Sequence, residues 1–230
     1  MNIARAAALP AAIAISLAAA ACGSGTPGGT AATPSLPSHA VLVSKVKAAL
    51  RDAKSVHVSG TVRQGGRLLG LDLSLTRDGG ISGQISVNGA GLNVLSTGGS
   101  TYIKVTKTFA KYQNIPASAC VLICGKWFKP TPAESQQMIG DISMTKLFAQ
   151  MTSSTKFQYG GTATVDGQPA WVLHSSDGST AYVAAQGNPY PLKIVGPHNS
   201  GQVSFTQWNA ATIPGPPPAS QVVDLSQLQG

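Results

Sequence analysis

Residues 56–105 read VHVSGTVRQGGRLLGLDLSLTRDGGISGQISVNGAGLNVLSTGGSTYIKV, and this stretch decides the fold. Apolar and polar side chains alternate along five short runs, as where Val56 and Val58 flank His57. Such alternation is typical of strands that are buried on one face. Glycine-containing turns separate the runs: Gly65-Gly66, Asp78-Gly79-Gly80, Asn88-Gly89 and Gly98-Gly99. These dipeptides favour tight hairpins, so the stretch predicts an antiparallel meander with one apolar face.

The apolar face of this meander has to be hidden from water. Helices could fill the space above it and make an ordinary packed core. The helices could instead stand away from the sheet and leave a dry cavity for acyl chains. Such a binding site would need no catalytic residue. The pattern leaves both arrangements open. The side chains that would line such a cavity are Val58, Leu69, Leu71, Leu73, Ile85, Val87, Leu92, Val94, Ile103 and Val105.

Two helices are predicted to cover the sheet. Residues 39–53 carry apolar side chains three and four apart, with basic residues on the other side. The second helix begins at Thr131-Pro132-Ala133-Glu134, a capping box with proline at the first helical position. Its apolar stripe is expected to consist of Met144, Leu147, Phe148 and Met151. Between the meander and this helix, residues 108–115 predict a helical turn.

Alternating runs return after residue 156. They predict strands at 157–165, 170–174, 180–184, 192–195 and 203–208, with Asp166-Gly167 as a hairpin turn. Residues 213–218 are proline-rich and therefore extended, and Val222, Leu225 and Leu228 predict a last short helix. One continuous sheet of about ten strands approaches the size at which open sheets curl. We therefore expect an α+β fold: a strongly curved antiparallel sheet with helices covering its concave face.

The N-terminus is typical of an exported protein. Residues 1–21 predict a signal peptide, with Arg5 ahead of an apolar stretch too short to span a bilayer. Cys22 follows Leu17 and a run of alanines, which resembles the lipobox of bacterial lipoproteins. Ordinary secretion after an A-x-A site is the alternative, but it would leave a free thiol at the new terminus.

We accordingly expect diacylglycerol on Cys22 and a lipid anchor on the extracytoplasmic face of the cell membrane. Two acyl chains make such an anchor durable. Residues 22–38 are rich in Gly, Pro, Ser and Thr and predict a flexible tether, and residues 39–230 predict a single domain.

The other two cysteines, Cys120 and Cys124, are separated by Val121-Leu122-Ile123. In an oxidising compartment this spacing favours a small disulfide loop. A redox pair would normally be C-x-x-C, and a metal site would need further ligands, which the neighbouring sequence does not offer. A disulfide is therefore predicted, with no metal and no cofactor.

The sequence carries neither a catalytic motif nor a nucleic-acid-binding pattern. Four histidines occur, and His57 and His174 alternate with apolar strand residues, which predicts that they face solvent. The single glutamate, Glu134, is explained by the capping box, and no nucleophile motif is present. The net charge of +8 comes from scattered lysines and arginines, without the dense basic stripe that nucleic acid would require. We therefore expect the protein to have no enzymatic activity and no nucleic-acid partner.

The order of these features resembles the LppX/LprG-type lipoproteins of actinobacteria. The resemblance rests on the lipobox, the tether, the meander ending in Tyr102-Ile103-Lys104-Val105, Trp127, the segment Gly187–Ile194 (GNPYPLKI) and Phe205-x-x-Trp208-Asn209. It implies a half-barrel related to LolA and LolB, with a hydrophobic cavity that carries lipid or acylated glycolipid. The Cys120/Cys124 pair departs from that pattern. A second hypothesis is an envelope scaffold or sensor that has a filled core and binds a protein partner.

Overall fold

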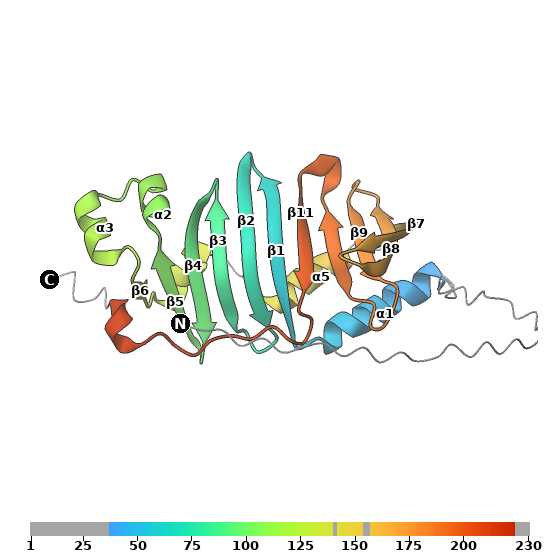
Figure 1. Cartoon of the computed structure of the whole chain (residues 1–230), viewed down its shortest axis with the longest axis horizontal. Helices are drawn as coiled ribbons and strands as arrows, with labels where there is room; N and C mark the ends of the chain where they lie inside the picture. Colours follow the sequence, from blue (N-terminus) through green and yellow to red (C-terminus); the bar gives the residue numbers. More distant parts are fainter. Residues whose placement is uncertain (1–36, 140–141, 154–156, 224–230) are drawn as a thin grey trace, which may run out of the picture. The chain divides into compact units, whose positions relative to one another are not determined.

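A single sheet organises the molecule. The computed structural model describes residues 37–139, 142–153 and 157–223. In these residues twelve strands form one sheet in the order β12-β6-β5-β4-β3-β2-β1-β11-β10-β9-β8-β7. The sheet is curved and does not close, which confirms the predicted half-barrel (Figure 1). The predicted signal peptide, Cys22 and most of the predicted tether lie outside the described residues.

The first five strands are the predicted meander: β1 (Ser55–Gln64), β2 (Arg67–Thr76), β3 (Ile81–Val87), β4 (Ala90–Thr97) and β5 (Ser100–Val105). Each pairs antiparallel with the next in the chain. The backbone of the turn between β3 and β4 explains its Asn-Gly sequence, because Asn88 and Gly89 both have positive φ, of 50° and 81°. Few side chains accept this left-handed backbone, so the dipeptide sets the register of the hairpin.

The second half of the sheet also follows the prediction. It comprises β7 (Phe157–Val165), β8 (Gln168–Ser175), β9 (Thr180–Ala184), β10 (Pro191–Val195) and β11 (Gly201–Thr206). β11 pairs antiparallel with β1, with Phe205 opposite Val58, and this pairing joins the two meanders into one sheet. A short 3₁₀ turn, Pro197–Asn199, links β10 to β11.

Two very short strands complete the sheet and correct one prediction. β6 (Trp127–Phe128) pairs with β5, and β12 (Val222–Val223) pairs parallel with β6. Val222 was expected in a final helix, but it follows a 3₁₀ turn, Ala219–Gln221, and is extended. The edge of β6 that faces away from β5 can form backbone hydrogen bonds with another strand, and β12 takes that place. A sequence pattern does not reveal such an edge. Leu225 and Leu228 lie outside the described residues.

In the part of the chain that the structure describes, five α-helices accompany the sheet: α1 (His39–Asp52), α2 (Lys107–Tyr112), α3 (Ala117–Ile123), α4 (Pro132–Ile139) and α5 (Met144–Ser153). The expected cysteine loop is in fact the helix α3. None of the helices within 37–139, 142–153 and 157–223 is long and apolar enough to cross a membrane.

The long helix expected after Thr131 is two helices. The capping box is present, with Thr131 Oγ1 accepting the Glu134 backbone N–H and Glu134 Oε2 accepting the Thr131 N–H at 2.8 Å. The pKa of the Glu134 carboxylate is lowered, most by the hydrogen bond from the Thr131 backbone N–H and further by one from the Thr131 hydroxyl at 2.9 Å. A second start follows at Ser143, whose Oγ accepts the Lys146 backbone N–H at 3.2 Å. A new N-cap begins a new helix, so the apolar stripe of Met144–Met151 belongs to α5 alone.

The core divides into two main clusters under the helices. In the larger cluster, Met144 and Phe148 of α5 and Leu50 of α1 pack against buried residues of β1–β5. In the second cluster, Leu42 of α1 packs against β8 and β9 and against Ala185. α1 therefore rests on both clusters, with its two ends held by different parts of the sheet.

Candidate functional site

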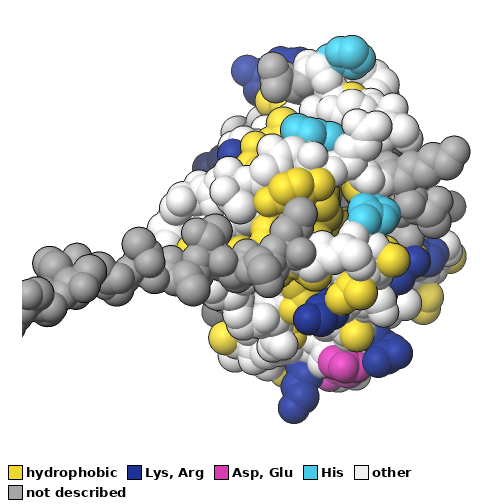
Figure 2. All heavy atoms as spheres, turned by 90° about the vertical axis from the view of Figure 1, so that its right-hand side faces the viewer, with side chains coloured by type: hydrophobic (Ala, Val, Ile, Leu, Met, Phe, Trp, Pro, Cys, Tyr) yellow, Lys and Arg dark blue, Asp and Glu magenta, His cyan; other side chains and the backbone are white. Residues whose placement is uncertain are grey.

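An apolar pocket lies between α1, α5 and strands β7–β10. Its volume is about 270 Å³. The apolar side chains that line it are Val43, Val46 and Leu50 of α1, Leu147 and Met151 of α5, and Phe157, Leu173, Ala181, Val183, Pro191 and Ile194 of the strands. Figure 2 looks onto this end of the folded unit and shows hydrophobic side chains gathered at the centre of the face. The arrangement suits an apolar ligand.

The middle of α1 contributes two apolar side chains to the pocket, between residues that anchor the helix in the core. Leu42 and Leu50 are almost fully buried, each in a different cluster. Val43 and Val46 lie between these anchors and are only partly buried. On β9 the pocket is lined by Ala181, the shortest of its apolar side chains. A short side chain at this position leaves room that a larger one would fill.

An aromatic stack beside the pocket holds its walls in place. The ring of Trp208 lies 4.4 Å from that of Tyr190, nearly parallel, and 5.6 Å from that of Phe148 of α5. The Trp208 Nε1–H donates to the Pro191 carbonyl at 3.1 Å. Pro191 lines the pocket, so this stack ties α5 to the strand that forms the pocket wall.

Polar side chains surround the apolar lining: Lys47, Gln150, Ser175, Asp177 and Ser179. Asp177 Oδ1 accepts the Ser179 backbone N–H at 2.9 Å. This bond is the main reason that the pKa of Asp177 is lowered. Lys47 is exposed, so the rim carries one acidic and one basic side chain.

The ten residues predicted to line a cavity do not line this pocket. Six of them are buried in the larger core cluster: Val58, Leu73, Leu92, Val94, Ile103 and Val105. Leu71 and Ile85 are partly buried against the same cluster, and Leu69 and Val87 are partly buried on neighbouring positions of β2 and β3. Met144 and Phe148 of α5 belong to the same cluster. The pocket is thus a different site from the predicted cavity, and the ligand contacts expected of these ten residues stay a prediction.

The pocket residues of α1 and α5 belong to helix faces that the apolar spacing predicts. The apolar strand residues of the pocket are not among the ten predicted cavity residues: Phe157, Leu173, Ala181, Val183, Pro191 and Ile194. All six lie on predicted strands or at their start. Strand alternation could identify their face of the sheet. It could not show that this end, rather than the meander, is incompletely filled.

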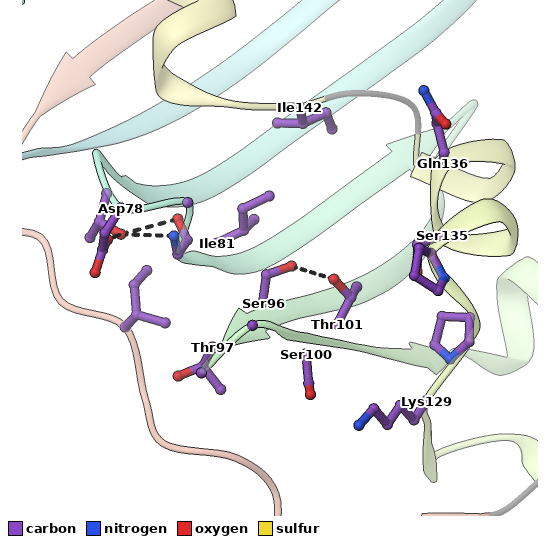
Figure 3. A pocket seen from close by; sticks show the side chains of 18 of the residues that line it. Asp78, Ile81, Ser96, Thr97, Ser100, Thr101, Lys129, Ser135, Gln136 and Ile142 are labelled. Atoms are coloured by element: carbon purple, nitrogen blue, oxygen red, sulfur yellow. Dashed lines mark hydrogen bonds between the residues drawn. The ribbon is translucent and has the colours of Figure 1, made fainter.

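A larger hollow of about 1080 Å³ lies elsewhere, between the ends of β2–β5 and α4 (Figure 3). Hydroxyl and amide groups dominate its lining, among them Ser96 and Thr101, whose oxygens are 2.9 Å apart. Asp78 contributes a carboxylate whose pKa is lowered, chiefly by a hydrogen bond from the Thr76 hydroxyl. The lining of this open cleft is more polar than apolar, in contrast to that of the pocket under α1.

The cysteine pair forms the expected disulfide. The sulfurs of Cys120 and Cys124 are 2.07 Å apart, and the bond closes the last turn of α3. Among the described residues, no group of three or more His, Cys, Asp or Glu side chains could hold a metal ion.

One polar cluster was not expected. His57 Nε2 lies 3.2 Å from Asp72 Oδ1, and His57 Nδ1 lies 3.3 Å from Ser74 Oγ. The residue types are those of a hydrolytic triad, but Asp72 is 71% exposed and the three lie side by side on the face of β1 and β2 that the helices leave uncovered. Such a flat surface does not exclude water or present an oxyanion site, so we interpret the cluster as cross-strand pairing. His174 makes a comparable contact with Thr180, at 3.0 Å.

Comparison with known proteins bears on the fold. LprF from Mycobacterium bovis matches 81% of this chain and 100% of its own at 17% identity, with a TM-score of 0.54. The chain has the LprF fold. The lipoprotein LppX from Mycobacterium tuberculosis matches 77% of this chain and 98% of its own at 16% identity, with a TM-score of 0.49. No family model and no curated protein matches the sequence. The fold implied by the resemblance is thus confirmed, and at these identities the likeness shows the fold alone.

Proposed function

We propose that this protein binds one acyl chain of a lipid or acylated glycolipid in the pocket between α1, α5 and β7–β10, as a carrier or chaperone in the cell envelope. The observation that carries the proposal is a pocket of about 270 Å³ whose lining is mostly apolar. Well-packed proteins seldom retain apolar space of this size without a use for it.

The size and lining of the pocket define the ligand. Pockets for drug-sized molecules span about 300–1,000 Å³, so this one suits a single slender chain. Each buried methylene contributes about 0.8 kcal/mol, which corresponds to roughly fourfold in affinity. Affinity should therefore rise with chain length until the pocket is full. The head group would stay at the rim, where Lys47 supplies a positive charge for a carboxylate or phosphate.

The proposed anchor places this activity at a membrane surface. Diacylglycerol on Cys22 would hold the domain on the extracytoplasmic face, within reach of lipids that enter or leave the bilayer. The proposed role requires only binding and release, with no chemical step.

Native mass spectrometry of the purified protein tests both the ligand in the pocket and the lipid anchor on Cys22. A ligand in the pocket should appear as a mass that is lost on denaturation, and exchange should occur with added fatty acid. The lipid on Cys22 should remain after denaturation and disappear in Cys22→Ser. Repeated absence of a releasable or exchangeable lipid would remove the carrier proposal, even if the anchor were present. A specific envelope protein that co-purifies without lipid would favour the scaffold or sensor hypothesis.

A further inference from the structure

The helix pair α2–α3 carries an unusually exposed group of apolar side chains. Val121 is 80% exposed, Leu122 is 52% exposed and Tyr112 is 40% exposed. We refer to these three residues as the α3 tip. They lie at the end of the sheet near β5 and β6, whereas α1 and the acyl-chain pocket lie near the other end (Figure 1). The tip is therefore separate from the proposed ligand site.

The disulfide keeps this surface exposed. Cys120 and Cys124 both pack against the larger core cluster, as do Phe109 and Ile115. The backbone next to them is also fixed, because the Gly125 N–H donates to the Val105 carbonyl at 2.9 Å. Val121 and Leu122 stand between the bonded cysteines and could turn inward only if the cysteines left the core. Their exposure is thus built into the fold.

The charge around the tip has one sign. Residues 79–133 contain five lysines and neither aspartate nor glutamate. Lys107, Lys111, Lys126 and Lys129 are exposed, and the Lys104 ammonium lies 4.5 Å from the centre of the Trp127 ring. Long lysine side chains can place their charge in the head-group region while nearby apolar groups enter the bilayer.

We infer that the α3 tip docks onto a bilayer that contains anionic phospholipid. Val121 and Leu122 enter the interfacial region, and the surrounding lysines bind lipid phosphates. Each lysine near an anionic surface contributes modestly and additively, so the contact is reversible and sensitive to salt. A bilayer fits better than a protein partner, because three apolar side chains on two short helices are far from the area of about 1,000 Å² that a specific protein interface needs. The inference does not depend on the ligand in the pocket.

Vesicle co-sedimentation of the mature chain, residues 22–230 with Cys22→Ser, tests the docking without the covalent anchor or the signal peptide. Binding is expected to vesicles of phosphatidylcholine with phosphatidylglycerol and to be much weaker to phosphatidylcholine alone. The double variant Val121→Ser/Leu122→Ser should lower the partition coefficient about tenfold relative to its parent. Val41→Ser is the matched control, because Val41 is 45% exposed on α1 and lies away from the tip. It should bind like the parent, and neither variant should change the melting temperature, since the altered side chains are exposed.

A second readout locates the contact and does not rely on the N-terminus. In Leu122→Trp the emission should shift to shorter wavelength and be quenched by brominated lipid when anionic vesicles are added, whereas Val41→Trp should not respond. Lys107→Gln/Lys111→Gln should reduce binding to anionic vesicles only. Equal binding by the tip variant and its parent, or no response from Leu122→Trp, would overturn the inference. The inference would also be overturned if the parent captured an acidic protein that the tip variant failed to capture, while the two proteins bound vesicles equally.

Discussion

Ala181→Phe is expected to weaken acyl-chain binding roughly 50-fold while the protein stays folded. The new ring would project into the pocket from β9 and take the space of about three methylenes. At about 0.8 kcal/mol per methylene, that loss is about 2.4 kcal/mol of binding free energy. Titration with a fluorescent fatty acid measures the affinity. The free energy of unfolding should change little, because the ring fills empty space that is already apolar.

Thr164→Phe provides the control for this experiment. Thr164 is exposed on β7 and does not line the pocket, so the same ring is added to a strand of the same half of the sheet. The control should bind fatty acid like the parent protein. If Ala181→Phe also bound with unchanged affinity, the ligand would have to lie outside the pocket.

Leu73→Ala should produce the opposite pattern, with a large loss of stability and little change in affinity. Leu73 is 1% exposed within the cluster formed by β1–β5 and α5. Removing a buried leucine side chain costs about 2–5 kcal/mol, because the cavity left behind closes only partly. Urea unfolding measures this cost, and fatty-acid titration well below the melting temperature should give an affinity within about twofold of the parent.

Val46→Ala is the reciprocal of Leu73→Ala. Val46 lines the pocket and is only partly buried, so its truncation should weaken binding more than it lowers stability. A Leu73→Ala protein that remained folded but lost fatty-acid binding would show that the ligand reaches β1–β5. That result would restore the cavity first expected from the sequence.

Much of the fold could be predicted because its signals are local. Alternation along β1–β5 and glycine-containing turns such as Asn88-Gly89 require only neighbouring residues. The same holds for the capping box at Thr131, which is present as expected. The division between α4 and α5 could also have been found locally, since Ser143 is a suitable N-cap. The strand β12 could not, because its pairing with β6 joins residues almost a hundred positions apart.

The position of the empty space could not be predicted in this way. Alternation shows which side chains of β1–β5 face inward, but the same pattern suits a filled core and a cavity. The outcome depends on contacts across the fold. Phe148 and Met144 pack against the meander in the larger cluster, whereas Ala181 lines the pocket together with residues of α1. These contacts are set by how α1 and α5 cross the sheet, which their own periodicity does not specify.

The sheet therefore separates two proposed activities. The acyl-chain pocket lies between α1, α5 and β7–β10. The α3 tip, which is proposed to dock onto the bilayer, lies at the other end of the sheet, near β5 (Figure 1). A filled meander between them provides the rigid connection. Loss of the tip should leave ligand affinity intact, and loss of the pocket should leave vesicle binding intact.

The most direct measurement is the position of a bound chain. Crystals grown with a bromine-labelled fatty acid would locate the bromine by its anomalous scattering. We expect the bromine between α1 and β9, close to Ala181 and Val46, and its absence from crystals of Ala181→Phe. Bromine found against β1–β5 or in the polar cleft of Figure 3, or an empty pocket at saturating fatty acid, would contradict the proposed site.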